Sequence, residues 1–233
     1  MTDEAVILAG GLGTRLRNVV SDIPKSMAPV NDKPFMSYLL DYLVDSGIKR
    51  VVLSVGFMHE KIMEYFNNRY KGIELAYSIE NEPLGTGGAL ALAMKSVWAD
   101  DVFVLNGDTL FNIDLIRLYD YHIKKCAHFS LALRKVEDAS RYGTVVCSEF
   151  NRVTEFREKD IIPGPGLING GIYIINKNYF NSLNLTGKFS LENDCFGKLC
   201  EASYIYGHVF DNYFIDIGIP DDFNKAQYEF KKF

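Results

Sequence analysis

Glu4-Ala5-Val6-Ile7-Leu8-Ala9-Gly10-Gly11-Leu12-Gly13-Thr14-Arg15 joins a short apolar run to a glycine-rich loop. The apolar run is typical of a buried β-strand. In the loop, glycines let backbone N–H groups approach phosphate oxygens, and Arg15 adds a positive charge. The loop lacks the third glycine of a dinucleotide-binding motif and the Gly-Lys-Ser/Thr of a P-loop. Taken alone, it leaves a tight structural turn as an open interpretation.

Apolar periodicity predicts alternating strands and helices through the first half of the chain. We expect strands at 4–9, 51–55, 73–78 and 102–105, and helices at 35–45, 59–67 and 87–97. This alternation predicts a parallel sheet covered on both faces.

The second half has a different pattern, in which strands follow one another with fewer helices between them. We expect strands at 129–133, 144–147, 153–156 and 171–175, and helices at 189–202 and 220–230. The chain is therefore predicted to be a single α/β domain, residues 1–233, with an antiparallel elaboration in its second half. In open sheets of this kind, ligands bind at the carboxyl ends of the strands.

Composition excludes several classes of protein. The net charge of -5 gives no general attraction for nucleic acid. No stretch approaches the roughly eighteen apolar residues of a membrane-spanning helix, and the acidic start is unlike a secretion signal. The four cysteines lack the spacing of a zinc site and are interpreted as reduced thiols. We therefore expect a cytoplasmic protein with no nucleic-acid or membrane partner.

Three charged side chains stand where they could stabilise a transition state or bind a metal ion. Lys25 lies between Pro24 and Pro29, and these rigid flanks suggest an ammonium fixed in position, as an anionic transition state requires. Asp108 and Asp216 each follow a predicted strand. Two carboxylates suit Mg²⁺ bound to a triphosphate, because phosphates and water complete its coordination.

The order and spacing of these segments resemble the sugar-1-phosphate nucleotidyltransferase family. Within the family, the chain is most similar to the guanylyltransferases that act on D-glycero-α-D-manno-heptose 1-phosphate. The closer match is carried by Ile23-Pro24-Lys25-Ser26-Met27-Ala28-Pro29-Val30, Glu82-Pro83-Leu84-Gly85-Thr86-Gly87-Gly88-Ala89, Leu167-Ile168-Asn169-Gly170-Gly171-Ile172-Tyr173, Phe189-Ser190-Leu191-Glu192 and Tyr213-Phe214-Ile215-Asp216-Ile217-Gly218. One departure is Ser26, where many relatives carry proline.

The resemblance implies a Rossmann-like α/β/α fold with a small sugar-binding part. Residues 1–110 would bind mainly the nucleotide, and residues 111–233 mainly the sugar phosphate. The implied reaction transfers GMP from GTP to the sugar 1-phosphate with Mg²⁺ as cofactor, giving GDP-heptose and pyrophosphate. The resemblance leaves a monomer and a homodimer equally open.

The resemblance also implies roles for individual residues. Arg15, Lys25 and Asp108 would be catalytic, and Asp108 and Asp216 would hold the metal. The implied nucleotide-binding residues are Leu8, Ala9, Gly10, Gly11, Gly13, Thr14, Glu80, Gly85, Thr86 and Gly107. The implied sugar-phosphate pocket contains Tyr142, Gly143, Glu158, Lys159, Asn169 and Gly170.

The base that the enzyme reads is predicted from chemistry. Guanine presents adjacent N1–H and N2–H donors, which suit one bidentate carboxylate such as Glu80 or Glu82. A solvated surface glutamate is an equally good interpretation of either residue, and loop backbone can also read a base.

Three other functions stay open on the sequence. A mannose 1-phosphate guanylyltransferase would use the same machinery, and an N-acetylmuramate 1-phosphate uridylyltransferase would differ by its use of UTP. A non-catalytic domain that binds nucleotide sugars is the alternative from another class. The intact set Arg15, Lys25, Asp108 and Asp216 argues against the last.

Overall fold

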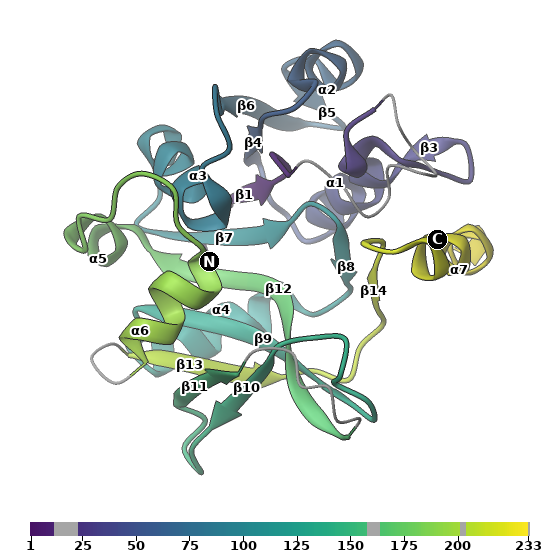
Figure 1. Ribbon diagram of the computed structural model, residues 1–233. Helices are drawn as coiled ribbons and strands as arrows, with labels where there is room; N and C mark the ends of the chain where they lie inside the picture. Colours follow the sequence, from purple (N-terminus) through teal and green to yellow (C-terminus); the bar gives the residue numbers. More distant parts are fainter. Residues whose placement is uncertain (12–22, 158–163, 201–203, 233) are drawn as a thin grey trace.

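The computed structural model describes residues 1–11, 23–157, 164–200 and 204–232 (Figure 1). Within these ranges, ten strands form one mixed sheet that runs through both halves of the chain. No helix in the described ranges is long and apolar enough to cross a membrane.

Four parallel strands form the centre of the sheet, in the order β7-β1-β4-β6. Their bounds are Glu4–Leu8 for β1, Arg50–Val55 for β4, Ile73–Ile79 for β6 and Asp101–Asn106 for β7. The short strand β5 (Arg69–Tyr70) adds an antiparallel edge beside β6. The predicted parallel sheet is confirmed, with strand bounds within one or two residues of those expected.

The second half extends this sheet through β12, which runs antiparallel to β7. β12 (Gly166–Asn176) also pairs with β9 (Phe129–Val136) and β10 (Thr144–Cys147), and β10 pairs with β11 (Val153–Arg157). The strand β13 (Ile205–Val209) pairs in parallel with β9 and was not predicted. The antiparallel elaboration is confirmed as a continuation of the same sheet.

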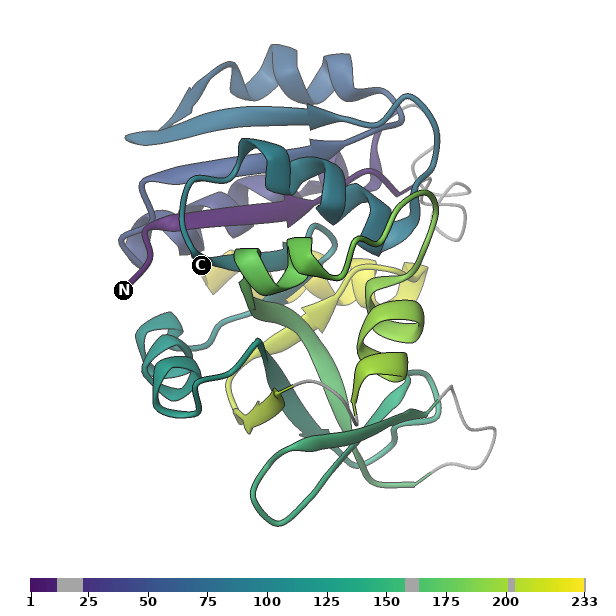
Figure 2. The ribbon, with the colours of Figure 1, turned by 90° about the vertical axis from the view of Figure 1, so that its left-hand side faces the viewer.

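Helices cover both faces of the sheet (Figures 1 and 2). An apolar layer lies on each face. Because side chains alternate along a strand, Ala5 and Ile7 of β1 enter one layer and Val6 enters the other. The first layer is completed by α1 (Phe35–Asp45), α2 (His59–Phe66), α4 (Leu115–Lys124) and α7 (Pro220–Glu229). The second is completed by α3 (Gly85–Ala93), α5 (Lys177–Ser182) and the helical residues 191–199. The three-layer α/β/α prediction is confirmed.

The helix expected at 189–202 differs most from its prediction. Ser190 is its N-cap, because the Ser190 hydroxyl accepts from the Asn193 N–H, so helical structure begins at Leu191. Residues Leu191–Phe196 form a wide π turn, which continues into α6 (Gly197–Leu199). Phe189 lies outside the helix in a crossing segment described below.

Other differences concern helix ends and missed elements. α3 starts two residues before the expected Gly87 and ends at Ala93, where one 3₁₀ turn follows. α4 was missed, although Asp114 caps it and Leu115 and Leu118 are buried at helical spacing. Also not predicted were α5 and the short strands β2 (Pro29–Val30), β3 (Lys33–Pro34) and β8 (Thr109–Phe111). The strand β14 (Phe214–Asp216) ends at Asp216, which was expected at a strand end.

Candidate active site

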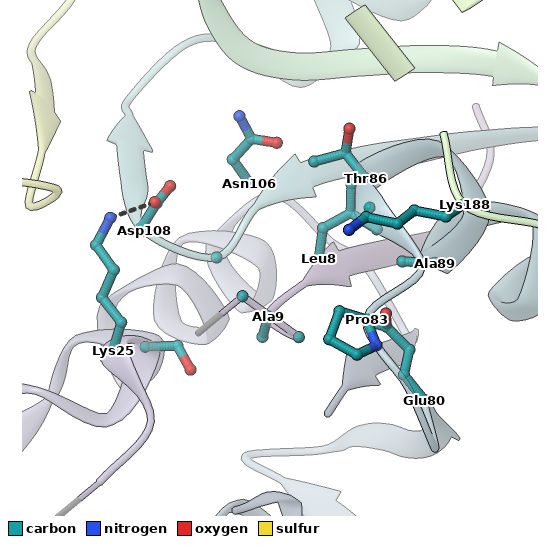
Figure 3. A pocket seen from close by; sticks show the side chains of 15 residues that line it. Leu8, Ala9, Lys25, Glu80, Pro83, Thr86, Ala89, Asn106, Asp108 and Lys188 are labelled. Carbon is teal, nitrogen blue, oxygen red and sulfur yellow. Dashed lines mark hydrogen bonds and ion pairs between the residues drawn. The ribbon is translucent and has the colours of Figure 1, made fainter. Parts of the chain in front are cut away.

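A cavity of about 320 Å³ opens at the carboxyl ends of β1, β6 and β7 (Figure 3). Its walls include every described residue that was predicted to bind nucleotide: Leu8, Ala9, Gly10, Gly11, Glu80, Gly85, Thr86 and Gly107. Lys25, Ser26, Pro83, Ala89, Asn106, Asp108 and Lys188 complete the lining. The predicted residues Gly13, Thr14 and Arg15 lie outside the described residues, as do Glu158 and Lys159.

Glu80 is packed directly against the loop that follows β1. A Cβ atom built on Gly10 would stand 1.9 Å from Glu80 Oε1, so a larger residue there would displace the Glu80 carboxylate. Glu80 Oε2 accepts a hydrogen bond from the Leu84 N–H at 3.1 Å. Burial raises the pKa of the Glu80 carboxyl, and the Leu84 N–H opposes that rise. Glu82 is exposed and does not line the cavity, so Glu80 is the one of these two glutamates that faces it.

The residues Gly187 to Ser190 cross the start of α3, and we call them the α3 strap. The Phe189 N–H donates to the Leu84 carbonyl at 3.0 Å, and the Phe189 carbonyl accepts from the Gly87 N–H at 3.0 Å. This crossing supplies a partner to the open N-terminus of the helix. It also brings Lys188 to the cavity wall beside Thr86 and Ala89.

Lys188 is a residue that sequence reasoning missed. The neighbouring run Phe189-Ser190-Leu191-Glu192 was singled out, but a lysine one residue earlier has the signature of an ordinary surface charge. Only the position of the α3 strap turns it toward the nucleotide cavity.

A second cavity, of about 710 Å³, adjoins the first, and both are lined by Asn106 and Asp108. Its other lining residues are Thr109, Arg141, Tyr142, Gly143, Phe156, Arg157, Asn169, Gly171, Glu192, Asn193, Phe214, Asp216 and Ile219. Tyr142, Gly143 and Asn169 were predicted here. Gly170 packs against the Phe111 ring instead, and its neighbour Gly171 takes the place at the wall.

Arg141 brings a positive charge to the second cavity. Its guanidinium pairs with Asp222 in the first turn of α7, and this hydrogen bond raises the pKa of Arg141. Sequence reasoning named Tyr142 and Gly143 but not this arginine. An anionic group in the cavity would therefore meet a fixed cation.

Lys25, Asp108 and Asp216 meet where the two cavities join. Lys25 starts a short 3₁₀ turn (Lys25–Met27), and its Nζ lies 2.5 Å from Asp108 Oδ2 and 4.0 Å from Asp216 Oδ1. Asp108 stands in the turn between β7 and β8, two residues beyond the end of β7. β14 pairs with β8 and places Asp216 opposite Thr109, beside Asp108. Pairing between distant strands thus assembles the triad.

The donor set at this point fits a hard divalent cation. The Asp108 and Asp216 carboxylates already share one cation, the Lys25 ammonium, and both are partly exposed, at 37% and 32%. In the described ranges, no group of three or more histidine, cysteine or acidic residues gathers. A metal held by the two carboxylates would therefore take its remaining ligands from phosphates and water, the usual arrangement for Mg²⁺.

Known proteins resemble this chain over nearly its whole length. The family model described as nucleotidyl transferase matches residues 4–232. D-glycero-alpha-D-manno-heptose 1-phosphate guanylyltransferase from Aneurinibacillus thermoaerophilus is 49% identical over 230 residues, which is 99% of each chain. The enzyme of the same name from Campylobacter jejuni is 48% identical over 223 residues, 94% of this chain and 96% of the relative.

A solved structure shares the fold of this chain. HddC from Yersinia pseudotuberculosis complexed with GMP-PN has a TM-score of 0.87 and 37% sequence identity, covering 97% of this chain and 99% of that chain. The matches extend over both cavities and both halves of the sheet. The chain therefore belongs to the nucleotidyl transferase family.

Proposed function

We propose that this chain transfers GMP from GTP to D-glycero-α-D-manno-heptose 1-phosphate and releases pyrophosphate, giving GDP-heptose. The observation that carries this proposal is the near full-length identity of 49% and 48% to two enzymes of that name. The complex of the Yersinia relative with GMP-PN supports a guanine nucleotide. The absence of long apolar helices among the described residues accords with a cytoplasmic site of action.

The two adjoining cavities suit a reaction between two substrates. The first would hold GTP, so that residues 1–110 serve mainly the nucleotide. The second, formed mainly by residues 111–233, would hold the sugar 1-phosphate with Arg141 near its phosphate. Asn106 and Asp108 line both cavities, so the α-phosphate and the sugar phosphate would meet beside them.

The reaction needs positioning and neutralisation more than a base. The oxygen of the sugar phosphate forms a bond to the α-phosphorus while the bond to the β-phosphate oxygen breaks, and pyrophosphate leaves. Both reactants are anions, so cations held in place lower the barrier. Lys25, only 13% exposed and held by two carboxylates, supplies one such cation. Arg15 and Lys159 are proposed to supply others on the resemblance alone.

Asp108 and Asp216 would hold Mg²⁺. When bound, the metal supplies charge neutralisation for the triphosphate. The carboxylates themselves keep the Lys25 ammonium oriented, and the Gly218 N–H donates to Asp216 Oδ1 at 2.6 Å. This hydrogen bond fixes the Asp216 carboxylate relative to the turn that precedes α7.

Turnover assays test the proposal most directly. Purified enzyme with Mg²⁺ is incubated with GTP, ATP, UTP or dTTP, each against the 1-phosphates of heptose, mannose and N-acetylmuramate, and pyrophosphate release is measured. We expect GTP with heptose 1-phosphate to give the highest kcat/KM. A higher value for mannose 1-phosphate or for UTP would overturn the substrate or the base assignment, respectively.

Asp108→Asn tests the metal site. The amide is isosteric and should leave the fold intact, but it is a poor ligand for Mg²⁺, so we expect turnover to be lost. Isothermal titration of Mn²⁺ in the presence of a non-hydrolysable GTP analogue should show weaker metal binding. The matched control is Asp194→Asn, an acid-to-amide change outside both cavities. Near-normal activity of Asp108→Asn in excess Mg²⁺ would remove Asp108 from the ligand set.

A further inference from the structure

A buried hydroxyl lies between the two cavities. Tyr173 of β12 has no solvent exposure, and its hydroxyl donates to Glu192 Oε1 at 2.9 Å. The Tyr173 hydroxyl oxygen also accepts a hydrogen bond from Asn169 Nδ2 at 2.6 Å. A β-bulge between Asn169 and Tyr173, where Gly171 has a φ of 73°, makes this contact within one strand. The Gly171 N–H donates to Asn169 Oδ1 at 3.0 Å.

Glu192 sets the direction of these hydrogen bonds. A carboxylate only accepts, so the single proton of Tyr173 goes to Glu192, and every other neighbour of the hydroxyl must be a donor. Burial raises the pKa of Tyr173 well above its usual value, so the hydroxyl keeps its proton. Glu192 Oε2 accepts from Thr86 Oγ1 at 2.8 Å and from Ser190 Oγ at 3.1 Å, which holds the carboxylate in place.

Asn106 of β7 is the second amide at this hydroxyl. Its side chain hydrogen-bonds to the Tyr173 oxygen as a donor and lowers the pKa of Tyr173. The Asn106 N–H₂ group is thereby directed at Tyr173. Asn106 Oδ1 is buried and has no hydrogen-bond partner among the described residues. A buried acceptor without a partner costs about 1–3 kcal/mol, so this orientation of Asn106 depends on the hydrogen bond that its N–H₂ group donates to Tyr173.

We propose that Glu192 is a positioning residue of the sugar-phosphate cavity, which acts through Tyr173 to hold both amides with their N–H₂ groups inward and so fixes Asn106 and Asn169 in the cavity wall. Both amides line the second cavity, as Glu192 does. The inference rests on the proposed function for the presence of a sugar 1-phosphate in this cavity.

The variant Glu192→Gln separates the positioning of the amides through Tyr173 from the hydrogen bonds that Glu192 accepts from Thr86 and Ser190. The glutamine oxygen can still accept from Thr86 and Ser190, so the nucleotide side is preserved. The N–H₂ group of the introduced glutamine then faces the Tyr173 hydroxyl. The Tyr173 proton must therefore turn away from residue 192, toward Asn106 or Asn169. Asn106, whose oxygen has no described partner to lose, rotates to accept that proton, and its place in the cavity wall changes. We expect the KM for the sugar 1-phosphate to rise at least tenfold, with the KM for GTP within about twofold.

Tyr173→Phe provides the decisive cycle. If Glu192 acts through Tyr173, the double variant should show the same KM for the sugar 1-phosphate as Tyr173→Phe alone. A further rise in the double variant would mean that Glu192 contacts the sugar directly, and would overturn the positioning role. Equal losses for both substrates in Glu192→Gln would also overturn it. If Tyr173→Phe does not fold, Asn106→Ala replaces it, and Glu192→Gln should again add nothing.

The control variant is Asp194→Asn, an acid-to-amide change two residues further along the same helical segment. Asp194 is bonded to the Ser190 N–H and to Lys198 rather than to Tyr173. Both KM values should stay within about twofold of wild type. Turnover by the wild type with GTP and heptose 1-phosphate is measured separately and alone decides the proposed function. The Glu192 cycle uses whichever sugar 1-phosphate the wild type turns over.

Discussion

Glu80 is the side chain that we propose distinguishes guanine from other bases. The Leu84 N–H occupies one carboxylate oxygen, and the other lies over Gly10 at the mouth of the loop. Partial burial strengthens any hydrogen bond that the carboxylate accepts, and makes the loss of its partner costly. Two adjacent donors of guanine would match the two oxygens better than the single N–H of uracil.

Replacing Glu80 with glutamine should weaken GTP selectively. The amide faces a guanine donor with a donor of its own, and an unpaired buried donor costs about 1–3 kcal/mol. We expect kcat/KM for GTP to fall at least tenfold, and that for ITP, which lacks the N2 amino group, to fall less. Glu82→Gln, at an exposed neighbouring acid, should change neither. Equal losses for GTP and ITP would show that Glu80 does not read N2.

The raised pKa of Glu80 predicts an acid limb in the activity. A raised pKa means that this carboxyl takes up a proton at a higher pH than a solvated glutamate does. As the pH falls, Glu80 should therefore be protonated at a higher pH than a solvated glutamate. The protonated carboxyl accepts the guanine hydrogen bonds less well, so kcat/KM for GTP should decline. The pH profile of Glu80→Gln should lack this limb, because its amide does not titrate. An unchanged acid limb in the variant would assign the titration to another group.

At the scale of elements, α3 and the α3 strap form one unit. A Cβ atom on Gly88 would stand 2.4 Å from the Gly187 carbonyl oxygen and 2.9 Å from Leu84 Cβ. Glycine inside a helix costs about 1 kcal/mol relative to alanine, so its presence here needs a reason. The close crossing of the strap is that reason, and it carries Lys188 to the wall of the first cavity.

Gly88→Ala should therefore destabilise the protein in spite of its better helix propensity. Overpacking costs about 1–3 kcal/mol, taken at its upper end because the clash is with backbone, and alanine recovers about 1 kcal/mol. We expect urea unfolding to show a net loss of about 2 kcal/mol and the KM for GTP to rise as Lys188 moves. Gly197→Ala is the control, since its Cβ would meet only Glu192 O, at 3.4 Å. If Gly88→Ala were more stable than the wild type, the α3 strap would be able to move away from the added methyl group without loss of stability.

At the scale of the whole molecule, the end of the chain packs against its beginning. Phe230, 1% exposed, stacks on Phe35 at 5.9 Å between ring centroids and meets Tyr38 edge-on at 4.6 Å. Gln227 donates to the Pro29 carbonyl at 2.7 Å, close to the turn that holds Lys25. The last helix thus closes the layer that supports the turn of Lys25, the lysine that we propose is catalytic.

Phe230→Ala should test this closure. Removing a buried phenylalanine costs about 3–5 kcal/mol, and in a chain of this size each kcal/mol lowers Tm by about 2–4 °C. We expect a fall in Tm of roughly 10 °C in a single transition, because one sheet joins both halves. Tyr228→Ala, at a side chain that is 73% exposed, should change stability by less than about 0.5 kcal/mol. Similar effects of the two variants would mean that the C-terminal residues do not support the core.

The sequence by itself determined the features that depend on local pattern. The bounds of α1 and β10 match their predictions, because apolar spacing and flanking turns decide them. The strand-end loops that line the nucleotide cavity were predicted as well, because carboxyl ends of parallel strands meet at one edge. Lys25, Asp108 and Asp216 could be selected in advance, since prolines and predicted strand ends mark them.

Only the tertiary structure decided which distant side chains share the cavities. Thr86 and Glu192 are 106 residues apart and meet because the α3 strap crosses α3, and Lys188 arrives by the same crossing. The direction of the Tyr173 hydrogen bonds was equally hidden, because it depends on a bulge and on a carboxylate from another element. The residue pattern within a segment decides whether that segment forms a helix or a strand, because the interactions involved lie within a few residues. The contacts above depend instead on how the elements pack against one another, and no spacing in the sequence records that packing.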